Sequence, residues 1–295
     1  MLFLGIKTLL DIRPLRESDL PAVLELSTQA GWNQAADDWR RLLTLWPATC
    51  LAGCLGDRLV ATATLAVFGS VGWIGMILVE QSQCRQGYGG EVLRAILGCG
   101  DALGLDCLGL DATDLGQPVY LKHGFAARAD IDRWVGPAVE GDSRADSATV
   151  LPLIETHWPQ VVELDRRCAG VDRGSLLRRL AGEEGASARG VLDGRRVVAA
   201  GFSRRGRVAG HVGPILADDV AAGETVLAAL LTDRYRIDGP SPVFVDVPHG
   251  SSLATALRAR GFVVRRKLTR MVRPAAAAVD LTGNGVLAAA GFELG

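Results

Sequence analysis

The residue types that are scarce in this sequence exclude several classes of function. Only 5% of its 295 residues are aromatic, and it contains 4 histidines and 6 cysteines. The cysteines, at positions 50, 54, 84, 99, 107 and 168, form no CxxC pair and accompany no histidine cluster. We therefore expect no metal site and no disulfide framework, and reduced thiols in a cytoplasmic protein are the simplest interpretation.

A charge of one dominant sign is also missing, since 32 basic and 33 acidic residues leave a net charge of −1. This balance gives no electrostatic reason to expect nucleic acid or an anionic membrane as a partner. The apolar start, MLFLGIKTLLDIRPL, is too short to span a membrane and lacks the cleavage site of a signal peptide. We expect residues 1–10 to be a poorly ordered leader or a first strand.

One stretch, residues 73–93, nevertheless has the pattern of an anion site. An apolar run at 74–79 predicts a buried strand, and Gly87, Gly89 and Gly90 precede the helical pattern EVLRAIL. A strand, a glycine-rich turn and a helix start together present backbone N–H groups to a phosphate. The stretch lacks the Gly-Lys-Ser/Thr ending of a Walker loop and the third glycine of a dinucleotide fingerprint. The alternative is a glycine-rich turn that binds no ligand.

The run CRQGYGG resembles the coenzyme A loop of the GCN5-related N-acetyltransferases (GNAT), Arg/Gln-x-x-Gly-x-Gly/Ala. Gly87 and Gly89 fill the glycine positions, whereas Cys84 stands where arginine or glutamine is usual. Further along, YLKHGF resembles the Tyr-x-Lys-x-Gly-Phe pattern near the end of the same fold. Tyr120 is its tyrosine, and the resemblance extends over residues 11–134.

The second half of the chain resembles a degenerate copy of the first. LPLIETHWPQVVELD parallels RPLRESDLPAVLELS, and HVGP parallels WIGM, both at an offset of 138 residues. The copy reads ADDVAAG at the loop position, so Asp218 and Asp219 would oppose a pyrophosphate there. We therefore expect no coenzyme in this half, which also resembles the C-terminal domain of bacterial tandem acetyltransferases.

The resemblance implies an α/β (α+β) protein with two tandem GNAT-type domains, each a mixed, mainly antiparallel sheet flanked by helices. We predict a catalytic domain at 1–136, a linker at 137–148, a degenerate domain at 149–274 and a tail at 275–295. The end of the tail, AAGFELG, is expected to add a last strand.

The implied activity is direct transfer of an acetyl group from acetyl-CoA to the amine of a small molecule, without a metal. The residues implied to hold the coenzyme are Ile77, Leu78, Val79, Arg85, Gln86, Gly87, Tyr88, Gly89 and Gly90. A backbone N–H near Leu78 or Val79 would polarise the thioester carbonyl. Tyr120 would protonate the leaving thiolate; the alternative is a core tyrosine with a bonded hydroxyl.

The general base stays open at this point. Relatives often place a glutamate early in the strand before the loop, where this chain has Trp73. Glu80 is one candidate, although a solvated loop carboxylate fits it as well; Asp38, Asp111 and an ordered water are others.

The acceptor pocket is expected to involve Trp32, Asn33, Gln34, Trp39 and Trp73. For the segment Gly31–Gln34 the alternative is a helix-to-helix turn with Trp32 in the core. The protein would be a monomer or a homodimer. The competing functional hypothesis is a non-catalytic acyl-CoA-binding or regulatory module.

Overall fold

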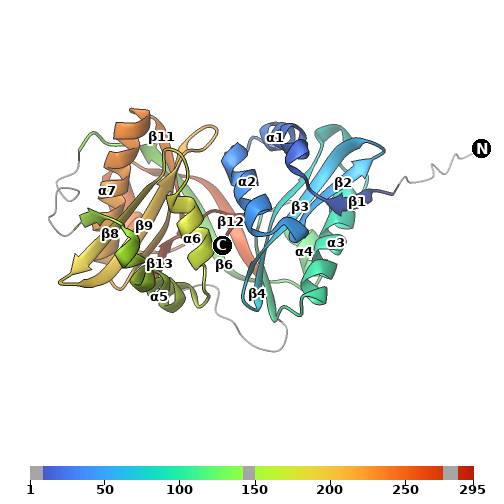
Figure 1. Cartoon of the computed structure of the whole chain (residues 1–295). Coiled ribbons are helices and arrows are strands. Elements are labelled where there is room, and N and C mark those ends of the chain that lie inside the picture. The colour runs from blue at the N-terminus through green and yellow to red at the C-terminus, as the bar shows by residue number, and fades with distance from the viewer. Residues whose placement is uncertain (1–8, 142–149, 275–284) are drawn as a thin grey trace, which may run out of the picture. The chain divides into compact units, whose positions relative to one another are not determined.

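The computed structural model describes residues 9–141, 150–274 and 285–295 (Figure 1). Its contacts divide the chain into two compact units. Unit 1 comprises the residues up to Ala66 together with Ile74–Gly104, and unit 2 comprises Val67–Trp73 together with Leu105–Gly295. The expectation for the first ten residues, and most of the expected linker, fall outside the described residues.

Unit 1 contains the first strands and three helices. The strands β1 (Asp11–Pro14), β2 (Cys50–Leu55) and β3 (Arg58–Phe68) pair antiparallel in that order, and β4 (Val71–Val79) follows. The helices are α1 (Leu20–Gln29), α2 (Ala36–Leu45) and α3 (Tyr88–Ala102). β2 and β3 form a hairpin, with Gly56 and Asp57 in the turn between them.

The helices of unit 1 bury their apolar faces on the sheet and on each other. In α3 the spacing of Val92, Leu93 and Ile96 places all three in the core. Gly53 of β2 lets this helix approach closely, because a Cβ there would lie 3.0 Å from Val92 Cγ1. The N-cap of α2 is Ala35, whose N–H donates to Asp38 Oδ2 at 2.8 Å.

Unit 2 contains the last elements of the first copy and the whole second copy, whose helices and strands follow in the same order as those of the first. After β5 (Cys107–Ala112), α4 (Gln117–Lys122) and β6 (Ala126–Pro137), the second copy begins. It consists of β7 (Val150–Pro152), α5 (Trp158–Ala169), α6 (Gly174–Ala181), β8 (Ser187–Asp193), β9 (Arg196–Arg204), β10 (Gly210–Ala217), α7 (Val220–Asp238), β11 (Pro242–Pro248), α8 (Leu253–Ala259) and β12 (Val263–Pro274). A last strand, β13 (Val286–Ala288), pairs with β10 and lies immediately before AAGFELG.

The fold class predicted from the sequence is confirmed. Among the described residues, antiparallel pairs predominate, and the parallel pairs are β4 with β5 and β10 with β11. The long helix α7 packs across β8, β9 and β10 in the second copy (Figure 1). Its buried leucines pack with valine, isoleucine and alanine side chains of the strands beneath it in one apolar cluster.

The last strand of each copy is exchanged with the other copy. β12 of the second copy lies between β5 and β6, pairing Thr269 with Ala112 on one side and Leu268 with Ile131 on the other. β6 of the first copy in turn lies between β12 and β11. The expected domain boundary at residue 136 therefore does not separate two compact units, because each copy supplies a strand to the other.

Two buried ion pairs connect the exchanged strands to their hosts. Arg270 of β12 binds both carboxylate oxygens of Asp111 at 3.0 Å, and Arg133 of β6 binds both oxygens of Asp246 at 2.7 Å. The two arginines are 137 residues apart, so they occupy equivalent positions in the two copies. Breaking such a buried pair leaves an uncompensated charge, which costs about 3–5 kcal/mol.

Candidate active site

The glycine loop of unit 1 turns through left-handed backbone before α3 begins. Arg85 has φ +66° and Gly87 has φ +85°, a combination that aims successive N–H groups to one side. Gly87 is the N-cap of α3 and offers no side chain to the first turn. The first N–H groups of a helix have no i−4 partner within it and can bind an anion, although here the Gly90 N–H donates to the Gly87 carbonyl at 3.1 Å.

Gly89 and Gly90 are not explained by the packing of the protein itself. A Cβ at Gly89 would make an ordinary contact with Val79 Cγ2 at 3.5 Å, and one at Gly90 would lie 3.7 Å from Arg94. Neither residue has a positive φ. Glycine in a helix costs about 1 kcal/mol relative to alanine, so a bare backbone here suggests a ligand that approaches closely. Gln86 is exposed beside them and Tyr88 is buried.

The strand before the loop has a strained residue that the sequence did not reveal. Met76 of β4 is buried and has φ +50°, which is uncommon for a residue other than glycine. Its carbonyl accepts a 2.7 Å hydrogen bond from Thr62 Oγ1. Such backbone persists only where the surroundings fix it, and it is common at ligand sites. It immediately precedes Ile77–Val79, where the pantetheine arm is expected. A methionine gives no sequence signal for this conformation.

Glu80, the weak candidate for the base, is neither freely solvated nor fully enclosed. Its Oε1 accepts a bond from Ser82 Oγ at 3.0 Å and pairs with Arg58 at 3.3 Å. Its Oε2 is buried and has no hydrogen-bond partner among the described residues. The carboxylate therefore has one oxygen that no described residue satisfies.

Tyr120 lies on α4 in unit 2, where its ring packs edge-on against Phe125 with 6.0 Å between centroids. Gly116 makes room for the ring, because a Cβ there would lie 2.9 Å from Tyr120 Cε2. Burial raises the pKa of Tyr120 to about 12, so the phenol stays protonated at physiological pH. No partner for the hydroxyl is found within the part of the chain that the structure describes.

The expected acceptor residues of unit 1 divide into two kinds. Asn33 and Gln34 are buried and Trp32 is half-buried, so this segment packs into the unit. Trp39 is fully buried, and its indole N–H donates to Ser27 Oγ at 3.1 Å. It therefore belongs to the core rather than to the wall of a pocket.

Asp38 and Asp111, the other candidates for the base, are both held in ion pairs. Asp38 binds Arg41 at 3.0 Å and the N–H of Ala35, and Asp111 is bound by Arg270. Burial raises the pKa of Asp111 against the opposing charge of Arg270. Both carboxylates therefore have structural roles in ion pairs.

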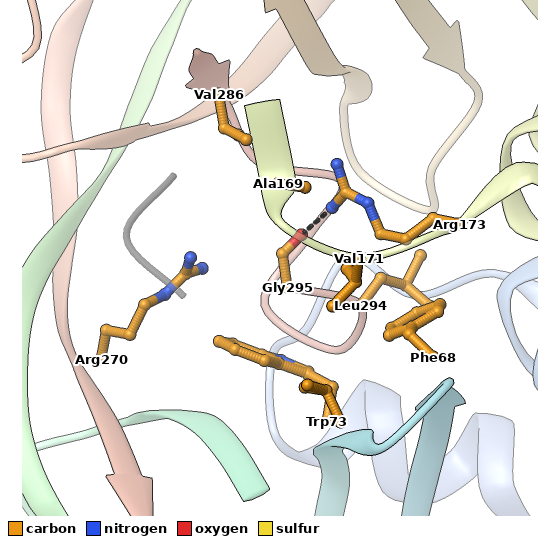
Figure 2. A pocket seen from close by; sticks show the side chains of 10 residues that line it. Phe68, Trp73, Ala169, Val171, Arg173, Arg270, Val286, Leu294 and Gly295 are labelled. Carbon is orange, nitrogen blue, oxygen red and sulfur yellow. Dashed lines mark hydrogen bonds between the residues drawn. The ribbon is translucent and has the colours of Figure 1, made fainter. Parts of the chain in front are cut away.

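Trp73 lines a small pocket within unit 2 (Figure 2). The pocket has a volume of about 30 Å³ and is lined by Phe68, Val71, Trp73, Ala169, Val171, Arg173, Arg270, Val286, Leu294 and Gly295. The Arg270 guanidinium lies 4.5 Å from the Trp73 ring centre, and the indole N–H donates to the Phe292 carbonyl at 2.9 Å. The contribution of residues 286–295 was not visible in the sequence, because it depends on contacts more than 200 positions apart.

The second copy lacks the features of the glycine loop. Only Asp218 and Asp219 separate β10 from α7, whereas residues 80–87 separate β4 from α3. Asp219 caps α7 by accepting the Ala222 N–H at 2.9 Å, so the helix start is already occupied. Asp218 pairs with Arg167 and Arg196 on the surface. These contacts give a physical reason to expect no phosphate here.

Comparison with known proteins agrees with this geometry. A model described as the acetyltransferase (GNAT) family matches residues 12–125, and one described as an acetyltransferase (GNAT) domain matches residues 161–281. The chain belongs to the GNAT acetyltransferases. Because both halves match, it is a tandem GNAT protein, and the predicted duplication is confirmed.

Its relatives share this organisation. The chain is 26% identical over 234 residues to the uncharacterized N-acetyltransferase YitH of Bacillus subtilis, covering 77% of this chain and 81% of the relative. The crystal structure of a putative acetyltransferase from Pyrococcus horikoshii covers 100% of this chain and 98% of its own, at TM-score 0.78 and 20% identity. A tandem GNAT protein from the clavulanic acid biosynthesis pathway covers 92% and 100%, at TM-score 0.65 and 15% identity.

Two further findings bear on partners of this GNAT protein. No described helix is both long and apolar enough to cross a membrane. Within residues 9–141, 150–274 and 285–295, no group of three or more His, Cys, Asp or Glu side chains is arranged to hold a metal ion.

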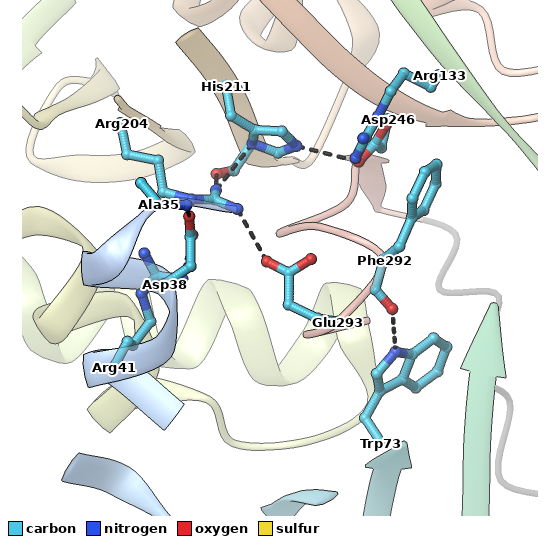
Figure 3. Close-up of polar contacts among 11 residues, drawn as sticks. Ala35, Asp38, Arg41, Trp73, Arg133, Arg204, His211, Asp246, Phe292 and Glu293 are labelled. Carbon is cyan, nitrogen blue, oxygen red and sulfur yellow. Dashed lines mark hydrogen bonds and ion pairs between the residues drawn. The ribbon is translucent and has the colours of Figure 1, made fainter. Parts of the chain in front are cut away.

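The second GNAT copy contains a buried chain of polar side chains (Figure 3). Arg204 lies 2.9 Å from His211 Nδ1, and His211 Nε2 lies 3.1 Å from Asp246, which also binds Arg133. Because arginine can only donate, Nδ1 accepts and Nε2 carries the proton. Burial and the charge of Arg204 lower the pKa of His211 to about 4. Burial opposes ionisation of Asp246, but Arg133 outweighs it and the net pKa is lowered.

This neutral histidine predicts a loss of stability in mild acid. The folded pKa of about 4 lies below the usual histidine pKa of 6.5, so the contribution to stability is complete above pH 6.5 and is lost as pH falls toward 4. The loss should reach roughly 3 kcal/mol, because each pKa unit is worth about 1.4 kcal/mol. Denaturant unfolding at pH 7.0 and 4.5 measures it. His211→Gln, which cannot titrate, should flatten the difference, and an equally steep pH dependence in that variant would contradict the assignment.

Proposed function

We propose that this GNAT protein is an acetyl-CoA-dependent N-acetyltransferase that transfers the acetyl group directly to the amine of a small molecule. The coenzyme would be held by Ile77–Val79 of β4 and by the residues from Arg85 to Gly90. The observation that carries the proposal is the pair Gly89 and Gly90, where no packing constraint of the protein requires glycine. A pyrophosphate lying against the backbone supplies that constraint.

The chemistry assigned to the side chains follows their protonation. The amine nitrogen attacks the thioester carbonyl carbon, the C–S bond breaks, and the thiolate takes a proton from the Tyr120 hydroxyl. A phenol whose pKa is raised to about 12 enters the reaction protonated. Glu80 would accept the amine proton, directly or through a water, with the buried Oε2 that has no partner in the described structure.

Two measurements test the proposal together. Calorimetric titration with acetyl-CoA should give one site per chain, because the second copy has no loop and its α7 start is capped by Asp219. Release of free coenzyme thiol should then depend on an added amine. Two equivalent sites would refute the claim about the second copy. Tight binding without thiol release over a broad amine panel would instead support the non-catalytic acyl-CoA-binding module.

Replacing Tyr120 by phenylalanine should separate catalysis from binding. The volume is nearly conserved and the contact with Phe125 stays, so the melting temperature should change little. Turnover should fall about 100-fold or more, the usual worth of general acid catalysis, while coenzyme affinity changes only modestly. The loss should shrink with an acyl donor whose thiol is more acidic. Full turnover in a folded variant would leave Tyr120 as a packing residue.

A further inference from the structure

The cleft between β10 and β11 in the second copy is filled by the chain itself. These strands pair in parallel only from Gly210 to Val212, opposite Val243 to Val245. Beyond that point the arm, defined here as residues 286–295, takes the space. Ile215 pairs with Ala288 of the arm, and the Ala289 N–H donates to the Asp246 carbonyl at 2.8 Å.

Small residues in the second copy leave the space that the arm fills. At Gly223 of α7 an added Cβ would collide with Leu287, and at Gly213 it would collide with the Ala289 carbonyl. Ala288 and Ala290 are fully buried. The arm is therefore seated firmly where the first copy is expected to admit its coenzyme, and the seat explains why these positions have no larger side chains.

The far end of the arm reaches the Trp73 pocket (Figure 2). Phe292 accepts the Trp73 indole N–H through its carbonyl, and the Gly295 carbonyl accepts a 3.0 Å bond from Arg173. Gly295 packs closely against the indole, because an added Cβ at this position would lie only 2.9 Å from Trp73 Cδ2. Leu294 completes the wall and is fully buried. The arm thus fixes both the orientation of Trp73 and the size of the space beside it.

The charged groups around the pocket are already engaged. Arg173 binds Asp165 through Nε and Nη2, and Arg270 binds Asp111. What remains for a ligand is the aliphatic surface of Val71, Val171 and Leu294 beside the indole, in a space of about 30 Å³. That volume is enough for about two water-sized groups, and its lining favours carbon over a charged group.

We propose that the arm is a specificity-determining wall of the acceptor pocket, and that the pocket takes a short apolar group carried by the amine substrate. This inference rests on the proposed function. The second copy would then serve the first: the cleft that no longer holds a coenzyme anchors the segment that selects the acceptor.

The test compares Leu294→Ala with Leu103→Ala, the same truncation at an exposed leucine in unit 1. Substrates are primary n-alkylamines from methylamine to hexylamine, with acetyl-CoA saturating. The parent and the control should prefer the short amines. Leu294→Ala should raise the ratio of kcat/KM for the longer over the shorter amines about 10-fold or more, the worth of one or two methylenes in an apolar pocket. Coenzyme affinity, measured by calorimetry, should be the same in all three.

A spectroscopic readout makes the test independent of turnover. In protein labelled with 5-fluorotryptophan, the Trp73 resonance is assigned by its loss in Trp73→Phe. Deleting residues 291–295 should shift that resonance, and Leu294→Ala should shift it less. An unmoved resonance, an unchanged amine ratio, or a parent that binds coenzyme but uses none of these amines would each overturn the inference. Failure of coenzyme binding in the parent would instead overturn the proposed function.

Discussion

Gly89→Asp should abolish coenzyme binding while leaving the protein folded. The backbone at Gly89 has no positive φ, and an added Cβ would meet only Val79 Cγ2 at 3.5 Å. The fold therefore tolerates the side chain. The coenzyme does not, because the carboxylate would stand against the pyrophosphate in a site that relies on bare N–H groups.

The measurement is the melting temperature with and without saturating acetyl-CoA. The parent should be stabilised by mass action, about 2.7 kcal/mol at a ligand concentration 100 times Kd, and the variant by nothing measurable. Gly98→Asp is the matched control, since it adds the same charge to α3 at an exposed position with open space around it. Equal ligand-induced shifts in the two variants would mean that the phosphates bind elsewhere.

Cutting the chain between the copies should leave neither half able to fold alone. Residues 1–141 lack β12, so β5 and β6 both lose a pairing partner, and residues 142–295 lack β6 in the same way. Unpaired strand edges of this length favour aggregation. Co-expressed, the two fragments should associate and unfold in one cooperative transition, which gel filtration and circular dichroism would show.

The ion pairs give this experiment a graded control. Arg270→Met in the second fragment leaves Asp111 buried and uncompensated, which should weaken association by about 3–5 kcal/mol, or roughly 10²- to 4 × 10³-fold. Arg265→Met changes an exposed residue of the same strand and should have little effect. A first fragment that is monomeric, cooperative and stabilised by acetyl-CoA on its own would show that the exchange is not needed for folding.

The helices and strands could be predicted from the sequence more fully than the pairing between the strands. Equal offsets between the halves predicted matching helices and strands, because apolar spacing is local and survives duplication. The exchange of β6 and β12 could not be predicted, because the two strands occupy equivalent positions in the duplicated sequence and either could pair beside β5 or beside β11. Arg133 and Arg270 are equivalent by offset, yet only the folded chain shows that each pairs with an aspartate of the other copy.

The candidate site shows the same division. The glycines and Tyr120 could be proposed as site residues because each belongs to a motif that is contiguous in the sequence. Met76 was missed because its conformation is imposed by the surrounding strands, and Leu294 because it reaches Trp73 only through the tertiary fold. Trp39 was expected in the pocket because it is a large aromatic residue close to Trp32 in the sequence, whereas the structure buries its side chain completely in the core.

The exchanged strands also bear on how the protein is made. The ribosome has synthesised the whole of the first copy by residue 137. The second partner of β5, which pairs with β4 on its other side, is made only when the ribosome reaches β12 at residues 263–274. More than a hundred further residues must be added first, which takes roughly 6–25 s at 5–20 residues per second. During that interval β5 has an open edge. The nascent chain should therefore depend on chaperones until its last third has been synthesised, and slowing translation within the second copy should lower the yield of active enzyme.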